Sequence, residues 1–119
     1  MGRKHFENLP DCTPLTACRS AVMEHKRLVG MLGSAARGEL DKSLPELEER
    51  VRQSEAVLAE AKRTALSTLD AIRVDRLRTV CASYYIDGLT IRQTAIFSEC
   101  GQRTVERYLS LIRDHSQEA

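Results

Sequence analysis

The side chains best suited to chemistry lie near the end of the chain, in GQRTVERYLSLIRDH, residues 101–115. Read as a helix, this segment has an apolar side and a polar side. The apolar side carries Val105, Tyr108, Leu109 and Ile112. The polar side carries Gln102, Arg103, Glu106, Arg107, Ser110 and Arg113. Arg103 and Arg107 lie one turn apart, and guanidinium groups so placed can bond a guanine edge bidentately or grip a phosphate. The segment therefore predicts a helix face suited to reading nucleic acid.

No other part of the sequence offers a comparable centre for catalysis or metal binding. The four cysteines, Cys12, Cys18, Cys81 and Cys100, include no C-x-x-C pair, and we expect free thiols that mainly pack, in a reducing compartment. His25 has no second metal ligand at helical spacing and is interpreted as a core or interface residue. Charged side chains recur at ordinary i, i+4 spacing, as on a solvated helix face. The sequence thus predicts no catalytic residue, no metal site and no cofactor.

The composition favours helices over strands. The chain has 119 residues, about one domain, with 4% aromatic residues and no Trp, and it is rich in Leu, Ala, Arg and Glu. We therefore expect an all-α fold. No apolar run approaches the roughly 18 residues of a membrane span, and the start MGRKHFENLPDCTPL lacks the apolar stretch of a signal peptide. We expect a cytoplasmic protein without membrane contact.

The first predicted helix begins at Thr13, whose hydroxyl can cap it, with Pro14 in the first turn. Its apolar residues recur at alternating steps of three and four, as in a helix with one narrow seam. This seam comprises Leu15, Cys18, Val22, His25, Val29 and Leu32. Gly33 and Gly38 then predict a loop over residues 33–43.

The second predicted helix begins at Ser43, which can form a capping box with Glu46, and Pro45 stands inside its first turn. Its apolar stripe continues for about seven turns. The stripe comprises Leu47, Val51, Leu58, Ala61, Ala65, Leu69 and Ile72. The pattern leaves open whether the helix breaks near Arg73.

Together the two helices, residues 13–73, predict an antiparallel hairpin that follows a flexible arm at residues 1–12. Each seam is too exposed to be stable alone, so the hairpin must pack on something. It can pack on itself and on the C-terminal part as an ordinary helical core. It can also self-associate, and because the core of so short a chain is small we expect a homodimer through the hairpin.

The C-terminal part, residues 74–119, predicts three shorter helices. Asp75 can cap the first, and Gly88 ends it with a left-handed turn. The apolar face of this helix carries Leu77, Val80, Cys81 and Tyr84, which leaves Tyr85 at the surface. Thr90 and Gln93 can form a capping box for the second. That helix runs through Ile91, Thr94, Ala95 and Phe97. A short helix that supports a second helix with a polar outer side is the helix-turn-helix arrangement.

The stretch LRTVCASYYIDGLTIRQTAIFSECGQRTVERYLSLI resembles the helix-turn-helix of sigma factor region 4. The nearest variant is that of small phage transcriptional regulators of the RinA and ArpU type, where YYIDGLT stands in place of their R-Y-I-D-G element. Ala95 matches the small residue at which the two helices approach, and Val105 matches the buried anchor. Glu99 stands where that family usually has the glycine of a left-handed corner, and Gly101 replaces the usual Ser or Thr cap.

This resemblance implies a phage or mobile-element transcription regulator that binds double-stranded DNA in the major groove, in the cytoplasm of a bacterial host cell. The DNA-binding residues that it implies are Thr90, Arg92, Gln102, Arg103, Thr104, Glu106, Arg107, Ser110 and Arg113.

The charge of the C-terminal part keeps other functions open. From residue 75 to the end, six arginines meet six acidic residues, whereas DNA-reading domains are typically basic. A mainly protein-directed adaptor or inhibitor, which grips RNA polymerase or another host protein, is therefore the main alternative. A DNA-packaging small subunit is a further one.

Overall fold

The computed structural model describes residues 9–118, with side chains as far as His115, and every regular element in this range is a helix. The elements are α1 (Thr13–Ala36), α2 (Leu44–Asp70), α3 (Asp75–Cys81), the π-helical turn η2 (Ala82–Ile86), α4 (Ile91–Phe97) and α5 (Gln102–Glu118). The all-α prediction is confirmed. Within the described range, no helix combines the length and apolar character needed to cross a bilayer.

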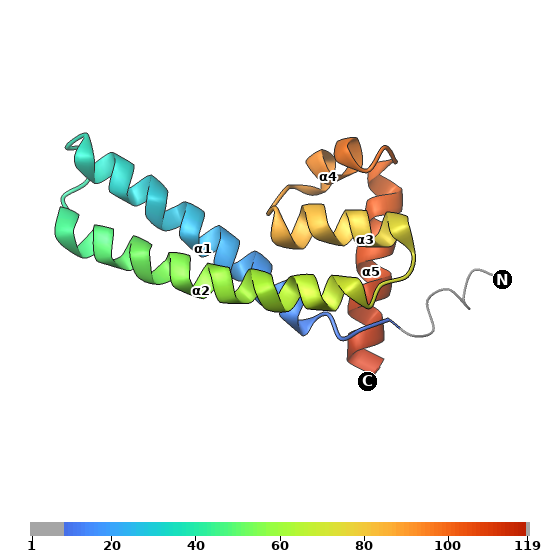
Figure 1. Ribbon diagram of the computed structural model, residues 1–119. Helices are drawn as coiled ribbons and strands as arrows, with labels where there is room; N and C mark the ends of the chain where they lie inside the picture. Colours follow the sequence, from blue (N-terminus) through green and yellow to red (C-terminus); the bar gives the residue numbers. More distant parts are fainter. Residues whose placement is uncertain (1–8, 119) are drawn as a thin grey trace.

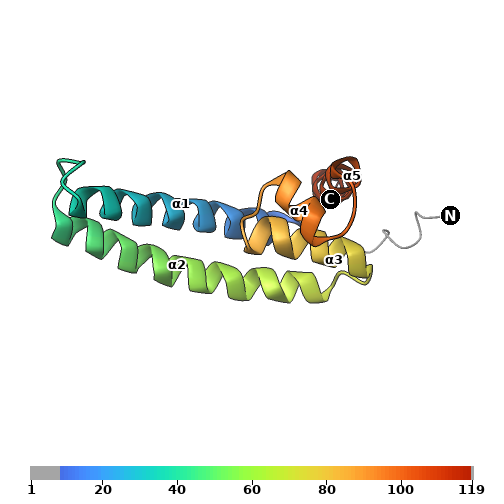
Figure 2. The same cartoon turned by 90° about the horizontal axis from the view of Figure 1, so that it is seen from above.

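The helices form an elongated molecule with extents of 57 × 26 × 20 Å (Figure 1). The antiparallel hairpin of α1 and α2 is the long arm, and the connection between them lies at its far tip. The remaining elements, α3, η2, α4 and α5, gather at the other end, where α2 finishes (Figures 1 and 2). We call these four elements the C-terminal unit.

The ends of α1 and α2 differ in detail from the sequence predictions. Thr13 is not the cap of α1, because the carboxylate of Asp11 accepts hydrogen bonds from both the Thr13 amide, at 3.0 Å, and its hydroxyl, at 2.8 Å. The helix then continues through Gly33 to Ala36. Ser43 precedes α2 but its side chain makes no capping bond, so the predicted box with Glu46 is absent. Pro45 has no amide, so it also removes the other first-turn donor that a cap side chain can bond.

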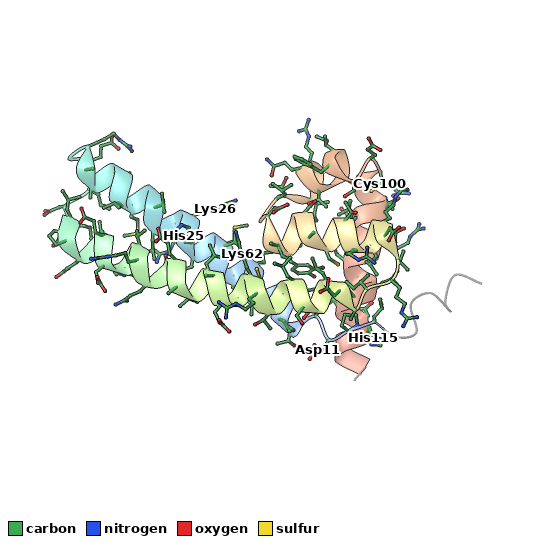
Figure 3. All side chains as sticks on the ribbon, viewed as in Figure 1. Asp11, His25, Lys26, Lys62, Cys100 and His115 are labelled. Carbon is green, nitrogen blue, oxygen red and sulfur yellow. The ribbon has the colours of Figure 1, made fainter. Side chains whose placement is uncertain are left out.

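The contact line between α1 and α2 also shifts along the hairpin. Near its base the predicted seam residues are buried, but farther out Leu28 is only 3% exposed while Val29 is 46% exposed. How the two helices cross decides which residues of α1 face α2, and here the contact line moves from Val29 onto Leu28. His25 is half-buried between the two helices, where its Nδ1 lies 2.8 Å from the Ser54 hydroxyl (Figure 3).

The long helix does break, as one reading of the sequence allowed. It ends at Asp70, and the guanidinium of Arg78 holds the following link by donating two hydrogen bonds to the Ile72 carbonyl, at 2.9 and 2.6 Å. Asp75 is the first residue of α3 rather than its cap, which is Val74, and its carboxylate pairs with Arg78 at 3.1 Å.

The π-helical turn exchanges the roles of the two adjacent tyrosines. Its backbone bond from the Asp87 amide to the Ala82 carbonyl spans five residues, so the chain turns less per residue than in an α-helix. As a result Tyr85, not Tyr84, continues the buried face of Cys81. One tyrosine is therefore in the core and the other is half-buried, but in the order opposite to the prediction.

One hydrophobic cluster joins the base of the hairpin to the C-terminal unit. It includes Leu15, Cys18 and Val22 of α1, Ala65 and Leu69 of α2, Leu77, Val80 and Cys81 of α3, and Val105, Leu109 and Ile112 of α5. Of the arm predicted at residues 1–12, residues 1–8 lie outside the described range, and Leu9 and Cys12 belong to this cluster. The four cysteines are free thiols, and only Cys100 is partly exposed.

Candidate nucleic-acid interface

The candidate interface begins at the start of α4, where the predicted capping box is confirmed. The Thr90 hydroxyl accepts a hydrogen bond from the Gln93 amide at 3.1 Å, and the Gln93 side chain accepts one from the Thr90 amide at 3.0 Å. Two orphan amides at the helix end are thereby satisfied. The buried residues of α4 are Thr94 and Ala95, so a small side chain does stand where α4 approaches α5.

The corner between α4 and α5 is built around a left-handed residue. Glu99 has φ +54°, as the comparison with a family glycine predicted. The Cys100 amide donates to the Ala95 carbonyl at 3.1 Å, and the Glu99 amide donates to the Ile96 carbonyl at 3.3 Å. This pair of bonds is the Schellman motif. It ends α4 sharply and leaves Cys100 at the corner (Figure 3).

Gly101 directly precedes α5, and its carbonyl accepts hydrogen bonds from the amides of Thr104 and Val105, both at 3.1 Å. The apolar side of α5 packs as predicted, with Val105, Leu109 and Ile112 buried in the shared cluster. Because one side of α5 is anchored in this way, its polar side is presented outward on a supported helix.

The structure divides the nine predicted DNA-binding residues by exposure. Seven are exposed: Thr90, Arg92, Gln102, Arg103, Glu106, Arg107 and Arg113. Two are partly buried: Thr104 and Ser110. Thr90 and Arg92 stand at the start of α4, while the others belong to α5. The hydroxyl of Thr90 already serves the capping box, which limits what it can offer to a ligand.

The polar residues of α5 fall into two groups. Glu106, Ser110 and Arg113 border a hollow of about 170 Å³ against Tyr84 and Ile91. Arg113 is engaged there, with its Nη2 3.3 Å from the Ser110 hydroxyl and its Nε 3.7 Å from the Asp114 carboxylate.

Arg103 and Arg107 form the second group. Neither makes an ion pair or side-chain hydrogen bond with another residue in the described part of the chain. Both guanidinium groups are exposed and carry their full set of donors, which suits them to a planar anionic or base-edge acceptor.

Two features of this end of the molecule were missed from the sequence. Arg19 of α1 donates hydrogen bonds to the carbonyls of Tyr84 and Leu89, so a hairpin residue holds the turn before α4. Its position beside the seam residue Cys18 is a weak signal that could have pointed to such a role. The second feature is the exposure of two large apolar side chains of α4, because Ile96 and Phe97 are both 70% exposed. Each lies two residues, or about 200°, around α4 from a buried residue, Thr94 or Ala95, and therefore on the outer side of the helix.

Comparison with known protein families matches residues 12–119 to the family described as ECF sigma factor. Searches of curated proteins and of solved structures found no match for the chain. The family match covers both the hairpin and the C-terminal unit, and thus includes the helix-turn-helix described above. The chain therefore belongs to the ECF sigma factor family, whose members are DNA-binding regulators of transcription.

Proposed function

We propose that the protein is a transcription regulator of phage or mobile-element type that reads promoter DNA by laying α5 in the major groove. One observation carries this proposal: Arg103 and Arg107 are exposed, lie one turn apart and have no ion-pair partner in the described range, on a helix whose opposite side is anchored by Val105 and Ile112. An arginine that bonds the edge of a guanine bidentately is the commonest specific contact in the major groove, and each such contact is worth about 1 to 3 kcal/mol.

The other predicted residues take supporting roles in this proposal. Gln102 at the start of α5 is exposed and can reach base edges beside Arg103, whereas Arg92 on α4 can contact phosphate. Glu106 lies between the two arginines in sequence and weakens non-specific attraction to DNA. The near-neutral charge of the C-terminal unit is then consistent with binding that depends on sequence more than on phosphate neutralisation.

The test is a selection of duplexes from a random pool at two salt concentrations, with three proteins. The wild type should enrich a defined sequence, and its binding should weaken as salt rises because phosphate contacts release counterions. Arg103→Ala with Arg107→Ala should abolish enrichment while leaving the melting temperature nearly unchanged. The matched control is Arg27→Ala with Arg37→Ala, which removes the same charge from exposed positions on the hairpin, outside the candidate interface, and should select like the wild type.

The outcome that contradicts this function is equally specific. It is the absence of any enriched sequence with the wild type at low salt, although the protein is folded by circular dichroism. Loss of enrichment in the Arg27 and Arg37 control would also contradict it, since binding would then depend on net charge and not on the α5 face.

A protein partner is the second candidate, and the exposed pair Ile96 and Phe97 favours it. Two neighbouring large apolar side chains, each 70% exposed, lie on α4 next to the proposed DNA-reading helix. Such residues are typical of contact surfaces for another protein. RNA polymerase is the partner that a promoter-binding regulator would meet there. Binding of purified host RNA polymerase should be lost with Ile96→Ser and Phe97→Ser but kept with Arg103→Ala and Arg107→Ala.

A further inference from the structure

A shallow apolar groove runs along the outer side of the hairpin, between α1 and α2. Its volume is about 520 Å³, and it is lined chiefly by Pro14 and Ala17 of α1 and by Ala56, Val57 and Ala61 of α2. Val57 is 61% exposed at its edge. A groove of small side chains bordered by a protruding valine can receive another helix at close range, but its shape alone does not identify that helix.

The charged side chains beside the groove indicate which helix binds there, because they follow a self-complementary order about Ala56. Glu49 and Arg52 lie seven and four residues before Ala56, and Glu60 and Arg63 lie four and seven residues after it. At 3.6 residues per turn, all four side chains project within about 40° of Ala56 on the same helix face. The order along this face is acid, base, small residue, acid, base.

We propose that a second copy of the chain binds this face, with the two α2 helices antiparallel and crossing at Ala56. A two-fold axis there places Glu49 opposite Arg63 of the partner subunit and Arg52 opposite Glu60 of the partner subunit. The symmetric contacts repeat both pairs, so four opposite-charge pairs form. A parallel arrangement would instead set each charge against its own copy, which is unfavourable, so the charges select the antiparallel pairing.

The side chains near the axis fit the same arrangement. Ala56 allows close approach of the two helices. Val57 lies about 100° around α2 from Ala56, toward the groove, so it stands at the edge of this contact. In the single chain, Arg52 pairs with Glu49 and Arg63 pairs with Glu60, each at 2.7 Å on the exposed surface. Exposed pairs of this kind contribute little stability, so little is lost when they are extended into an intermolecular network.

The pairing leaves the ends of the molecule apart. Ala56 lies 14 residues before the end of α2 at Asp70, so the two α2 ends stand about 42 Å apart along the helix axis at 1.5 Å per residue. The two C-terminal units are therefore at opposite ends of the dimer. This inference is independent of the proposed function, because it depends only on α2 and the groove.

The experiment is sedimentation equilibrium of the full chain at micromolar concentrations, with charge reversals. Arg52→Glu with Arg63→Glu places acids opposite acids and should raise the dimer dissociation constant at least roughly 100-fold, because like charges across an interface strongly oppose association. Adding Glu49→Arg and Glu60→Arg to that variant restores complementarity with every sign reversed, and the dimer should return. Arg27→Glu with Arg37→Glu makes the same change in net charge away from this face and should remain dimeric.

Three results would overturn the proposal. The first is a monomeric wild type at these concentrations. The second is a dimer that Arg52→Glu with Arg63→Glu leaves intact. The third is a folded fourfold variant, as judged by circular dichroism, that stays monomeric, because the pairing about Ala56 would then be wrong.

Discussion

The guanidinium carbon of Arg19 on α1 lies 3.7 Å from the centroid of the Tyr84 ring in η2. The same guanidinium donates hydrogen bonds to the Tyr84 carbonyl and, at 2.9 Å, to the Leu89 carbonyl. Leu89 directly precedes Thr90, the cap of α4. One arginine of the hairpin thus fixes the turn from which the helix-turn-helix begins, and it makes the hairpin part of the support for the candidate interface.

We predict that Arg19→Ala lowers the free energy of unfolding by about 2 to 3 kcal/mol, because it removes a charged donor from two carbonyls and a cation from an aromatic face. Arg19→Lys should recover less than half of this loss, since an ammonium cannot span both carbonyls. Arg27→Ala, at an exposed ion pair on the same helix, should change stability by less than about 0.5 kcal/mol. Urea unfolding measures all three, and equal losses for Arg19→Ala and Arg27→Ala would contradict the assigned role.

The packing of the turn at Gly88 against the hairpin can be tested by comparing Gly88 with Gly38. Both have left-handed backbone, with φ +71° and +77°, but their surroundings differ. A Cβ added at Gly38 meets nothing within 4 Å, whereas one at Gly88 would lie 2.5 Å from the Val22 Cγ1 of α1. Gly38→Ala should therefore cost only about 1 kcal/mol for its backbone. Gly88→Ala should cost a further 1 to 3 kcal/mol or so from overpacking against the hairpin. Thermal melts of the two variants decide this, and similar losses would mean that α1 can move away from the turn.

Features that depend on residues within one or two turns could be predicted from the sequence. The Thr90–Gln93 box, the left-handed Gly88 and the left-handed Glu99 are all of this kind, since the partner or the backbone requirement lies within a few positions. The division of α5 into a buried and a polar side followed from its periodicity for the same reason. The prediction of a Ser43–Glu46 capping box was wrong, because a local pattern allows such a hydrogen bond but does not require that it forms.

Features that depend on two distant elements could not be predicted. Whether Leu28 or Val29 faces α2 is decided by how the helices cross, which no pattern within α1 contains. The exchange of Tyr84 and Tyr85 follows from one wider backbone turn. The role of Arg19 depends on carbonyls about 65 to 70 positions later in the chain. These contacts are tertiary, and tertiary packing routinely overrides local preference.

Glu99 leads to a prediction in the opposite direction from Gly38. Both residues occupy the same left-handed position of a Schellman motif, but Glu99 has a Cβ that this conformation disfavours. Glu99→Gly should raise the free energy of unfolding by several tenths to about 1 kcal/mol, after allowance for the greater freedom of glycine in the unfolded chain. Glu99→Ala keeps the Cβ and should give no such gain. If Glu99→Ala stabilised the protein as much as Glu99→Gly, the carboxylate and not the backbone would be responsible.

Burial in the shared core should also make stability depend on alkaline pH. Burial raises the pKa of the Cys81 thiol to about 12, with a smaller contribution from the neighbouring Cys12. Burial likewise raises the pKa of the Tyr85 hydroxyl. The unfolded chain releases the Cys81 proton near pH 8.5 and the Tyr85 proton near pH 10, roughly, while the folded chain keeps both. The contribution of these two groups to the free energy of unfolding is therefore fully present below about pH 8. It is lost as the pH rises toward their pKa values in the folded protein.

We predict that the free energy of unfolding decreases by about 1.4 kcal/mol for each pH unit above about 8.5 for one retained thiol proton, and more steeply above about 10, where Tyr85 adds to it. Cys81→Ala should lower stability at pH 7 through a small cavity but flatten most of the decline between pH 8.5 and 10, because the group that contributes most to it is gone. Burial also raises the pKa of the Cys18 thiol, and this group accounts for the decline that is left. Cys100→Ala, at the partly exposed corner, should keep the wild-type slope. Urea unfolding under reducing conditions at pH 7, 8.5 and 9.5 measures the slopes. An unchanged slope in Cys81→Ala would show that the Cys81 thiol becomes ionised in the folded protein or that another group controls the pH dependence.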